Sequence, residues 1–249
     1  MRTTLITGSA GVRDWGLEPS ADLVASNRLL SIVSAIPSLG RIVRIYRPAP
    51  TVAFSGSERR LPGFEDAVSH ATVFGFEPVV RPAGGRMVAV DQDWLIVDVI
   101  TPEPYLANAH RDIYQAFGAE FVELLRGLGV DAAMGAVEGE YCPGDYSINA
   151  RGQVKIVGTA QRVRRGARLF SASIPFAISD NVRELFKRVN ATLELDWNPA
   201  TLGSICEENP NLTFAQFEAA VVETFAKQHE KRTSLADIYR HSRALALQF

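Results

Sequence analysis

The order of strand-like and helix-like segments is the feature that most constrains the fold of this 249-residue chain. A helical pattern opens at Ser20 and stops before Pro37, and short β-branched runs then alternate irregularly with helices. A doubly wound parallel sheet needs a regular strand–helix–strand order, which is missing here. The pattern therefore predicts an α+β fold, a mixed α/β sheet with flanking helices. The expected strands are 41–46, 51–55, 76–80, 87–90, 94–100, 131–137, 145–149, 153–158 and 168–175, and the expected helices are 20–36, 64–74, 108–128, 180–190, 213–229 and 233–246.

Turn signals add detail to this assignment. The first 19 residues are expected to be irregular, because glycines and a proline interrupt them. The strands 87–90 and 94–100 are expected to pair with each other around the turn Asp91-Gln-Asp93, and Asn149-Ala-Arg-Gly152 is expected to form a hairpin turn. With no repeat or linker, residues 1–249 form one expected domain, with a sheet-containing core over about 20–197 and a short helical C-terminal tail over about 198–249.

Composition excludes several classes of protein. The 26 basic and 28 acidic residues give a net charge of −2, so bulk charge does not attract nucleic acid. The longest uncharged stretch, 29–40, is far shorter than the roughly 20 apolar residues of a membrane span. No secretory segment opens the sequence, and two cysteines without a histidine cluster favour neither a disulfide framework nor a metal site. We expect a cytoplasmic protein without membrane, nucleic-acid or metal partners.

The first candidate binding segment is Arg81-Pro-Ala-Gly-Gly-Arg86. Paired glycines let backbone N–H groups approach a ligand closely, and the two arginines offer forked donors for a carboxylate or phosphate. A tight hairpin turn with solvated arginines is the alternative explanation.

The second candidate combines a cysteine and a lysine. Cys142 lies in the loop Glu140-Tyr-Cys-Pro-Gly144, where a thiol is more accessible than on a strand. A nucleophilic thiolate needs nearby positive charge, which Lys155 across the hairpin can supply. Lys155 interrupts an apolar strand and precedes Gly158-Thr-Ala160, so it can polarise a carbonyl or neutralise an acyl phosphate. The alternatives are a small buried cysteine and a lysine that extends its amine to solvent.

A basic cluster follows this strand. It suits an acidic docking partner, although charges that protect an exposed strand edge explain it equally well. The cluster comprises Arg162, Arg164, Arg165 and Arg168.

Together these segments resemble the lipoate–protein ligase A superfamily, which contains ligases and octanoyltransferases and is related to the biotin protein ligase catalytic domain. The resemblance covers roughly residues 20–230 and rests on Arg41-Ile-Val-Arg-Ile-Tyr-Arg-Pro-Ala-Pro50, on the glycine-pair loop with Val88 and Asp91 after it, and on Lys155-Ile-Val-Gly-Thr-Ala-Gln161. It implies the biotin/lipoate ligase-like catalytic fold and transfer of lipoyl or octanoyl groups to a carrier-domain lysine. The implied catalytic residues are Cys142 and Lys155, and the implied acyl site comprises Arg81, Gly84, Gly85, Arg86, Asp91, Gly158, Thr159, Ala160 and Gln161.

Three functions follow from the resemblance. The arginine after the glycine pair and the cysteine before the lysine strand resemble cysteine-type octanoyltransferases, in which an acyl carrier protein donates and the only bound group is a transient acyl thioester on Cys142. In an ATP-dependent ligase, free lipoate or octanoate with ATP and Mg would form an acyl adenylate held by Lys155 and Arg86, and Cys142 would be incidental. The third is a non-catalytic relative that binds an acyl group or a lipoyl carrier domain, since Val90-Asp91 and Ser171-Ala-Ser173 stand where the family often has histidines.

Overall fold

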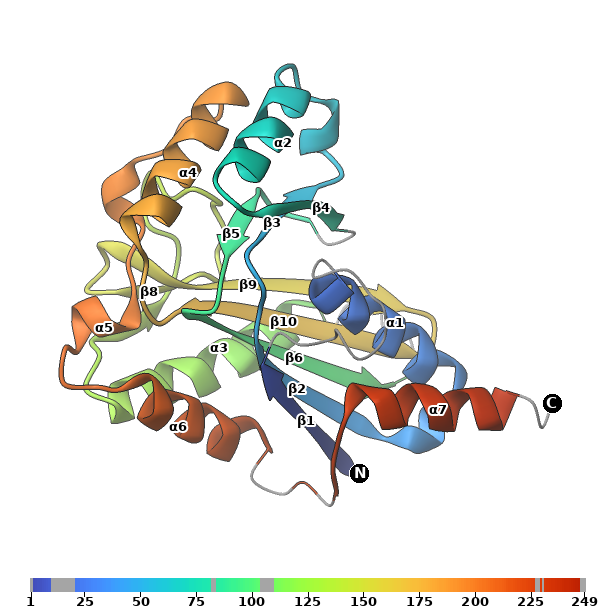
Figure 1. Cartoon of the computed structure of the whole chain (residues 1–249). Helices are drawn as coiled ribbons and strands as arrows, with labels where there is room; N and C mark the ends of the chain where they lie inside the picture. The colour runs from blue at the N-terminus through green and yellow to red at the C-terminus, as the bar shows by residue number, and fades with distance from the viewer. Residues whose placement is uncertain are drawn as a thin grey trace.

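The computed structural model describes residues 2–9, 21–81, 84–103, 110–226, 229 and 231–246. Its centre is an eight-stranded mixed sheet in the order β11-β1-β2-β6-β10-β9-β8-β7, whose longer strands are seen lengthwise in Figure 1. The strands of this large sheet are β1 (Thr3–Ser9), β2 (Arg41–Arg47), β6 (Trp94–Pro102), β7 (Ala132–Met134), β8 (Ile148–Ala150), β9 (Val154–Arg164), β10 (Ala167–Pro175) and β11 (Lys231–Thr233).

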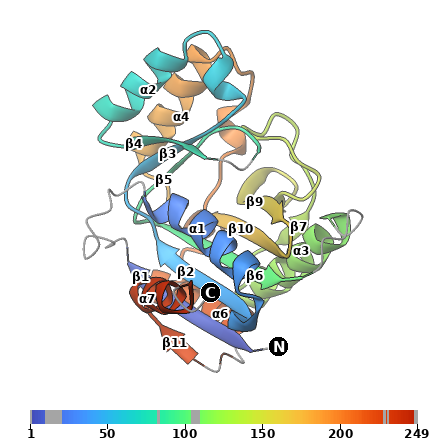
Figure 2. The ribbon, with the colours of Figure 1, turned by 90° about the vertical axis from the view of Figure 1, so that its right-hand side faces the viewer.

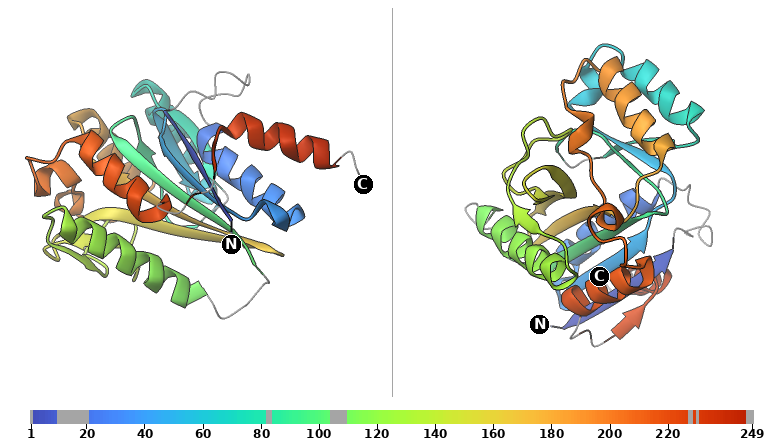
Figure 3. Two further views of the ribbon diagram at one scale, coloured as in Figure 1. Left: turned by 90° about the horizontal axis from the view of Figure 1, so that it is seen from below. Right: turned by 90° about the vertical axis from the view of Figure 1, so that its left-hand side faces the viewer.

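Helices cover both faces of the large sheet. Side chains of α3 (His110–Gly127) and α6 (Phe214–Ala226) pack with Val43, Val97 and Phe170 on one face, and Figure 3 shows these two helices lying side by side there. On the other face α1 (Ala21–Ala35) and α7 (Leu235–Ala246) pack with Ile42 and Ile100 in one apolar cluster, and Figure 2 shows both helices beside the sheet. The predicted mixed sheet with flanking helices is therefore confirmed.

A smaller lobe stands above one end of the large sheet (Figure 1). It contains a three-stranded sheet in the order β4-β3-β5 and two covering helices, which share a separate apolar core. Its elements are β3 (Thr51–Ser55), β4 (Glu77–Arg81), β5 (Val88–Val90), α2 (Phe64–Val73) and α4 (Asp180–Thr192). Short turns of helix, η2 (Pro37–Leu39), η3 (Glu58–Arg60), η4 (Pro199–Thr201) and α5 (Ile205–Glu208), complete the described elements.

At each end of the chain the structure has a strand that the sequence did not predict. The first residues are not wholly irregular, because Thr3–Ser9 forms β1, which pairs in parallel with β2 and buries Leu5 at 1% exposure. The tail is not purely helical, since β11 pairs in parallel with β1. Both strands pair with segments distant in sequence, so no local hairpin signal announces them. Residues 10–20, including the predicted helix start at Ser20, lie outside the described residues.

The predicted pairing of residues 87–90 with 94–100 is also wrong. β5 pairs with β3 of the small sheet, whereas β6 pairs with β2 and β10 of the large sheet. The intervening turn, in which Trp94 N–H donates to the Asp91 carbonyl at 3.0 Å, carries the chain from one sheet to the other. All three β5 residues are buried, and the apolar pattern of such a strand does not identify its partner.

The predicted hairpin turn between β8 and β9 is confirmed. The Asn149 side chain accepts a hydrogen bond from Gly152 N–H at 3.0 Å, and Arg151 and Gly152 adopt φ values of 55° and 66°. This turn fixes how β9 runs past the loop that carries Cys142. Among the described residues no helix combines the length and apolarity needed to cross a membrane.

Candidate active site

A cavity of about 340 Å³ lies between the large sheet and the small lobe. Its volume is in the range of small-molecule sites, about 300–1,000 Å³. Apolar side chains of β3, β5 and β6 line one wall, and small residues of β9 and β10 line the floor. Its lining includes Arg81, Gly84, Gly85, Arg86, Val88, Val90, Ile96, Tyr114, Tyr141, Cys142, Tyr146, Ser147, Lys155, Gly158, Thr159, Ala160, Gln161, Ser171 and Ser173.

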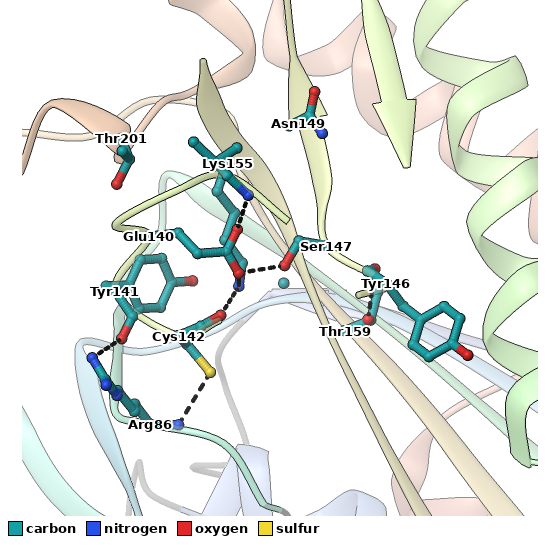
Figure 4. A network of polar contacts seen from close by, with 12 residues as sticks. Arg86, Glu140, Tyr141, Cys142, Tyr146, Ser147, Asn149, Lys155, Thr159 and Thr201 are labelled. Carbon is teal, nitrogen blue, oxygen red and sulfur yellow. Dashed lines mark hydrogen bonds and ion pairs between the residues drawn. The ribbon is translucent and has the colours of Figure 1, made fainter. Parts of the chain in front are cut away.

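Cys142 faces the glycine-pair loop in this cavity (Figure 4). Its Sγ accepts a hydrogen bond from the backbone N–H of Arg86 at 3.1 Å. Gly85 has a φ of +93°, and a Cβ atom at this position would lie 3.1 Å from Cys142 Sγ. Glycine is therefore required both by the backbone conformation and by the close approach of the thiol. The Arg86 N–H and the glycine pair together fix the position of the Cys142 thiol in the cavity.

Lys155 lies beneath the same loop and is almost completely buried (Figure 4). Its Nζ donates to the carbonyl oxygen of Cys142 at 2.6 Å and to Glu140 Oε1 at 3.1 Å. The Tyr141 ring centroid lies 4.8 Å from this nitrogen. The ammonium group therefore holds the main chain of Cys142.

Tyr141 anchors the cysteine loop to the small lobe. Its ring packs edge-on against Phe186 of α4 and Trp197, with centroid distances of 5.0 and 6.4 Å. Burial, and to a lesser extent the neighbouring Cys142 sulfur, hold the pKa of the Tyr141 hydroxyl well above its ordinary value. Tyr141 is therefore a neutral wall of the cavity at physiological pH.

The side chain of Arg86 bridges two segments of main chain. Its Nη1 donates to the carbonyl oxygens of Asp196 at 2.9 Å and Tyr141 at 3.4 Å. Arg81 in turn donates from Nη2 to the carbonyl of Arg86 at 2.9 Å. Both guanidinium groups thus hold the loop around Cys142 through backbone carbonyls.

The rest of the cavity is suited to an apolar chain. Gly158 and Ala160 of β9 lie opposite Ser173 and Ser171 of β10, so small side chains form the floor. Beyond them, Tyr114 of α3 stacks on Tyr146 with a centroid distance of 4.8 Å. A thiol in the lining of a largely apolar cavity of this volume can hold an acyl group as a thioester.

The structure gathers the sequence-predicted site around this cavity with one exception. Every predicted catalytic and acyl-site residue lines the cavity except Asp91. Asp91 lies in the turn after β5 and accepts a hydrogen bond from Asp93 N–H at 2.9 Å, and burial raises its pKa. Pro82 and Ala83 of the glycine-pair loop lie outside the described residues.

The predicted docking arginines lie at the other end of β9 and in the following turn and strand. Arg164 lies nine positions beyond Lys155 along β9, about 30 Å at the rise of a β-strand. Arg168 is only 7% exposed and forms an ion pair with Glu103 at 2.5 Å. Arg164 is exposed and donates to Ser31 Oγ at 2.5 Å, and Arg165 is exposed in the turn. The structure therefore does not bring this cluster together with the thiol.

Two buried carboxylates at the site were missed from the sequence. Glu140 accepts hydrogen bonds within the cysteine loop, and Glu58 accepts from Met87 N–H at 2.6 Å and so fixes the start of β5. Both are at most 2% exposed, which is rare for glutamate, and Glu140 is ion-paired with Lys155 at 3.1 Å. The position of Glu140 two residues before Cys142 was the available signal. Among the described residues no group of three or more potential metal-ligating side chains was found.

Comparison with known proteins adds independent findings. The family model described as "Lipoyl protein ligase A/B catalytic domain" matches residues 31–226. The octanoyl-[GcvH]:protein N-octanoyltransferase of Geobacillus kaustophilus is 32% identical over 125 residues, which are 50% of this chain and 44% of that protein. The chain spans about half the length of the curated relatives that it matches.

Solved structures share the fold over nearly the whole chain. A lipoate-protein ligase A bound with ATP has a TM-score of 0.67 at 18% identity, covering 98% of this chain and 93% of that chain. A bipartite lipoate protein ligase of Thermoplasma acidophilum, studied with its E2 lipoyl domain, has a TM-score of 0.65 at 17% identity, covering 98% and 92%. At this identity the likeness concerns the fold, and it confirms the predicted biotin/lipoate ligase-like catalytic fold.

Proposed function

The chain belongs to the lipoyl protein ligase A/B catalytic domain family, and we propose that it transfers an octanoyl or lipoyl group to a carrier-domain lysine through a thioester on Cys142. The observation that carries this proposal is the contact of 3.1 Å between Cys142 Sγ and the backbone N–H of Arg86 inside the acyl-sized cavity. A cysteine with an N–H donor on its sulfur and an apolar cavity beside it has the features of a nucleophile for acyl transfer.

The reaction proceeds in two steps. The Cys142 sulfur attacks the acyl carbonyl carbon of the donor, the new carbon–sulfur bond forms, the bond to the donor's leaving group breaks, and the thiol proton departs with that group. The amine of the acceptor lysine then attacks the thioester carbon. The carbon–nitrogen bond forms as the carbon–sulfur bond breaks, and a proton from the amine returns to the Cys142 sulfur.

The chain's own residues support both steps by holding the reacting atom. The Arg86 N–H stabilises the attacking and departing thiolate, since hydrogen bonds to ionised groups are about twice as strong as neutral ones. Lys155 fixes the Cys142 carbonyl and brings a positive charge close to the loop. The Tyr141 ring and the apolar walls exclude water, which limits hydrolysis of the thioester.

The partners of both cations favour the transferase over the ATP-dependent ligase. A ligase would need Lys155 and Arg86 to bind the carboxylate and the α-phosphate of an adenylate. Here Lys155 is directed at Glu140 and the Cys142 carbonyl, and Arg86 Nη1 is directed at two main-chain carbonyls. An adenylate could be bound only through the N–H donors that these contacts leave over, whereas thioester chemistry on Cys142 uses the contacts as they stand.

The curated relatives' name suggests the two partners. It describes transfer involving octanoyl-[GcvH] and a protein amine. We therefore propose an octanoylated carrier protein as donor and a lipoyl domain as acceptor. For the donor we favour a GcvH-type carrier over an acyl carrier protein.

A donor comparison tests this function. Octanoylated GcvH-type carrier, octanoyl-acyl carrier protein, and octanoate with MgATP are each mixed with an acceptor lipoyl domain, whose octanoylation is followed by mass spectrometry. We expect transfer from a carrier without ATP, loss of that transfer in Cys142→Ala, and normal transfer in the matched Cys206→Ala control. Octanoate-dependent pyrophosphate release that survives Cys142→Ala would establish a ligase instead. Saturable octanoate binding without turnover from any donor would establish a non-catalytic relative.

A further inference from the structure

Glu140 is a buried carboxylate at the centre of the loop that carries Cys142. Its side chain is 0% exposed, and its two oxygens accept three hydrogen bonds. Oε1 accepts from Ser147 Oγ at 2.7 Å and from Lys155 Nζ at 3.1 Å, and Oε2 accepts from Val137 N–H at 3.1 Å. The carboxylate thus connects both ends of the loop to the ammonium group beneath it (Figure 4).

Glu140 and Lys155 require each other because both are buried. The Lys155 side chain is 5% exposed, and removing one partner of a buried ion pair leaves the other charge uncompensated. An uncompensated buried ammonium tends to lose its proton or to move toward solvent. In either case Lys155 would no longer hold the carbonyl of Cys142, which it now contacts at 2.6 Å.

The same carbonyl belongs to the residue whose sulfur meets the glycine-pair loop. Lys155 Nζ fixes the main chain of Cys142 through its carbonyl oxygen, and the backbone N–H of Arg86 contacts the Cys142 sulfur. A shift of the Cys142 main chain would therefore alter the position of the thiol relative to its N–H donor. A misplacement of about 1 Å is sufficient to cost about 100-fold in rate.

We propose that Glu140 is a positioning residue, which keeps Lys155 charged and directed at the Cys142 carbonyl and thereby places the thiol for acylation. This inference rests on the proposed function, since it concerns formation of the acyl-enzyme. Glu140 also connects Val137 to Ser147, so its alternative role is to close the loop by these two hydrogen bonds. In that case the effect of substituting Glu140 would not depend on Lys155.

A double-mutant cycle separates the two roles. Glu140→Gln retains a hydrogen-bond acceptor of the same shape but removes the charge, and Lys155→Met removes the ammonium. Acyl-enzyme formation is measured by mass spectrometry under single turnover for the wild type, both single variants and the double variant. We expect Glu140→Gln to lower the maximal rate about tenfold, with an unchanged half-saturating donor concentration. In the Lys155→Met background the same substitution should change the rate less than about twofold, because coupled residues are not additive.

Two further measurements complete the test. Alkylation of Cys142 by iodoacetamide in a Cys206→Ser background reports thiol placement even where acylation is too slow to follow. It should slow in both single variants, with no further slowing in the double variant. Ser147→Ala removes a different hydrogen bond to Glu140 but keeps the ion pair, so we expect at most about a threefold loss of acylation rate. Thermal unfolding of every variant identifies any that fails to fold.

Three results would overturn the proposal. If Glu140→Gln slowed acyl-enzyme formation equally in the wild type and in Lys155→Met, Glu140 would act in loop structure alone. The same would follow if Ser147→Ala slowed acyl-enzyme formation as much as Glu140→Gln. A wild-type rate in Glu140→Gln would show that the charge is not needed. If the wild type forms no acyl-enzyme, the proposed function itself fails and Glu140 fails with it, whereas normal wild-type acylation without coupling refutes Glu140 alone.

Discussion

At the scale of single residues, the contact between Cys142 and the glycine-pair loop determines what the site can do. Cys142 Sγ lies against the backbone N–H of Arg86, and a Cβ atom at Gly85 would crowd this sulfur at 3.1 Å. Gly84, the other member of the pair, has no heavy atom within 4 Å of where its Cβ would lie. The two adjacent glycines therefore have different roles, which substitution can separate.

Alanine at each glycine gives a matched pair of variants. Gly85→Ala places a Cβ 3.1 Å from Cys142 Sγ on a backbone with φ of +93°, a strain of about 1–2 kcal/mol. We expect acyl-enzyme formation to fall at least tenfold, which corresponds to about 1.4 kcal/mol. Gly84→Ala should change this rate by less than about threefold. Single-turnover acylation of both variants checks the prediction, and equal rates would show that the Cys142–Arg86 contact is not important for the chemistry.

Residue-level chemistry was the part of the site most accessible from the sequence. The glycine pair, Cys142 and the Lys155 strand were each identified by residue type and spacing, and the cavity brings them together. What the sequence did not reveal is which groups the Lys155 and Arg86 side chains contact. Lys155 is aimed at the Cys142 carbonyl and Glu140, and Arg86 at main-chain carbonyls. Hydrogen-bond partners of this kind depend on tertiary contacts that a pattern of residue types does not encode.

At the scale of elements, a buried polar cluster joins α1 to the large sheet behind the cavity. Arg44 of β2 forms an ion pair with Asp22 of α1, and Ser26 of α1 donates to Asp98 of β6. Burial raises the pKa of both aspartates, although the Arg44 charge opposes this effect. Asp98 also accepts a hydrogen bond from Ser171 on the cavity floor, so the cluster supports the site from beneath.

This cluster predicts a pH dependence of stability. Because the folded-state pKa of Asp98 is raised above its unfolded value, its contribution to stability is present below about pH 3.9 and is lost as pH rises through the folded pKa. We expect the decrease in Tm between about pH 4 and neutrality to be shallower in Asp98→Asn than in the wild type. Asp66→Asn, at an exposed position of α2, should keep the wild-type slope. Parallel Tm–pH curves for wild type and Asp98→Asn would show that Asp98 does not titrate as described.

Elements also mark the limit of sequence-based prediction for the fold. The long amphipathic helices α3 and α4 and the β8–β9 hairpin were predicted because their signals are local. The partners of β1, β5 and β11 lie far away in sequence, and periodicity contains no information about which distant strand will pair. The strand pairs were therefore predicted incompletely, whereas the fold class was predicted correctly.

At the scale of the whole molecule, the remaining question is where the proposed acceptor domain would dock. Of the four arginines predicted to form a docking surface, Arg164 and Arg165 are exposed, whereas Arg168 is ion-paired and buried. Arg164 lies about 30 Å from Lys155 along β9. Only a bulky partner can contact both the arginines and the thiol, and a carrier domain meets this requirement better than a free fatty acid.

Charge reversal tests this surface. We expect Arg164→Glu with Arg165→Glu to slow transfer from a preloaded acyl-enzyme to the acceptor domain several-fold at low salt, because exposed charges mainly alter association rates. The difference should decrease at high salt through screening. Lys187→Glu with Arg188→Glu on the exposed side of α4 serves as the matched control and should transfer normally. Equal slowing of acyl-enzyme formation would place the arginines in the acyl site or the fold rather than on a docking surface.

The account as a whole depends on a covalent intermediate at Cys142. Its most direct test is the intact mass of the protein after incubation with an octanoylated donor and no acceptor. The wild type and Cys206→Ser should each gain the mass of one octanoyl group, which added lipoyl domain then removes, and Cys142→Ala should gain none. A wild-type mass that stays unchanged while the acceptor still becomes octanoylated, or an adduct that persists in Cys142→Ala, would contradict it.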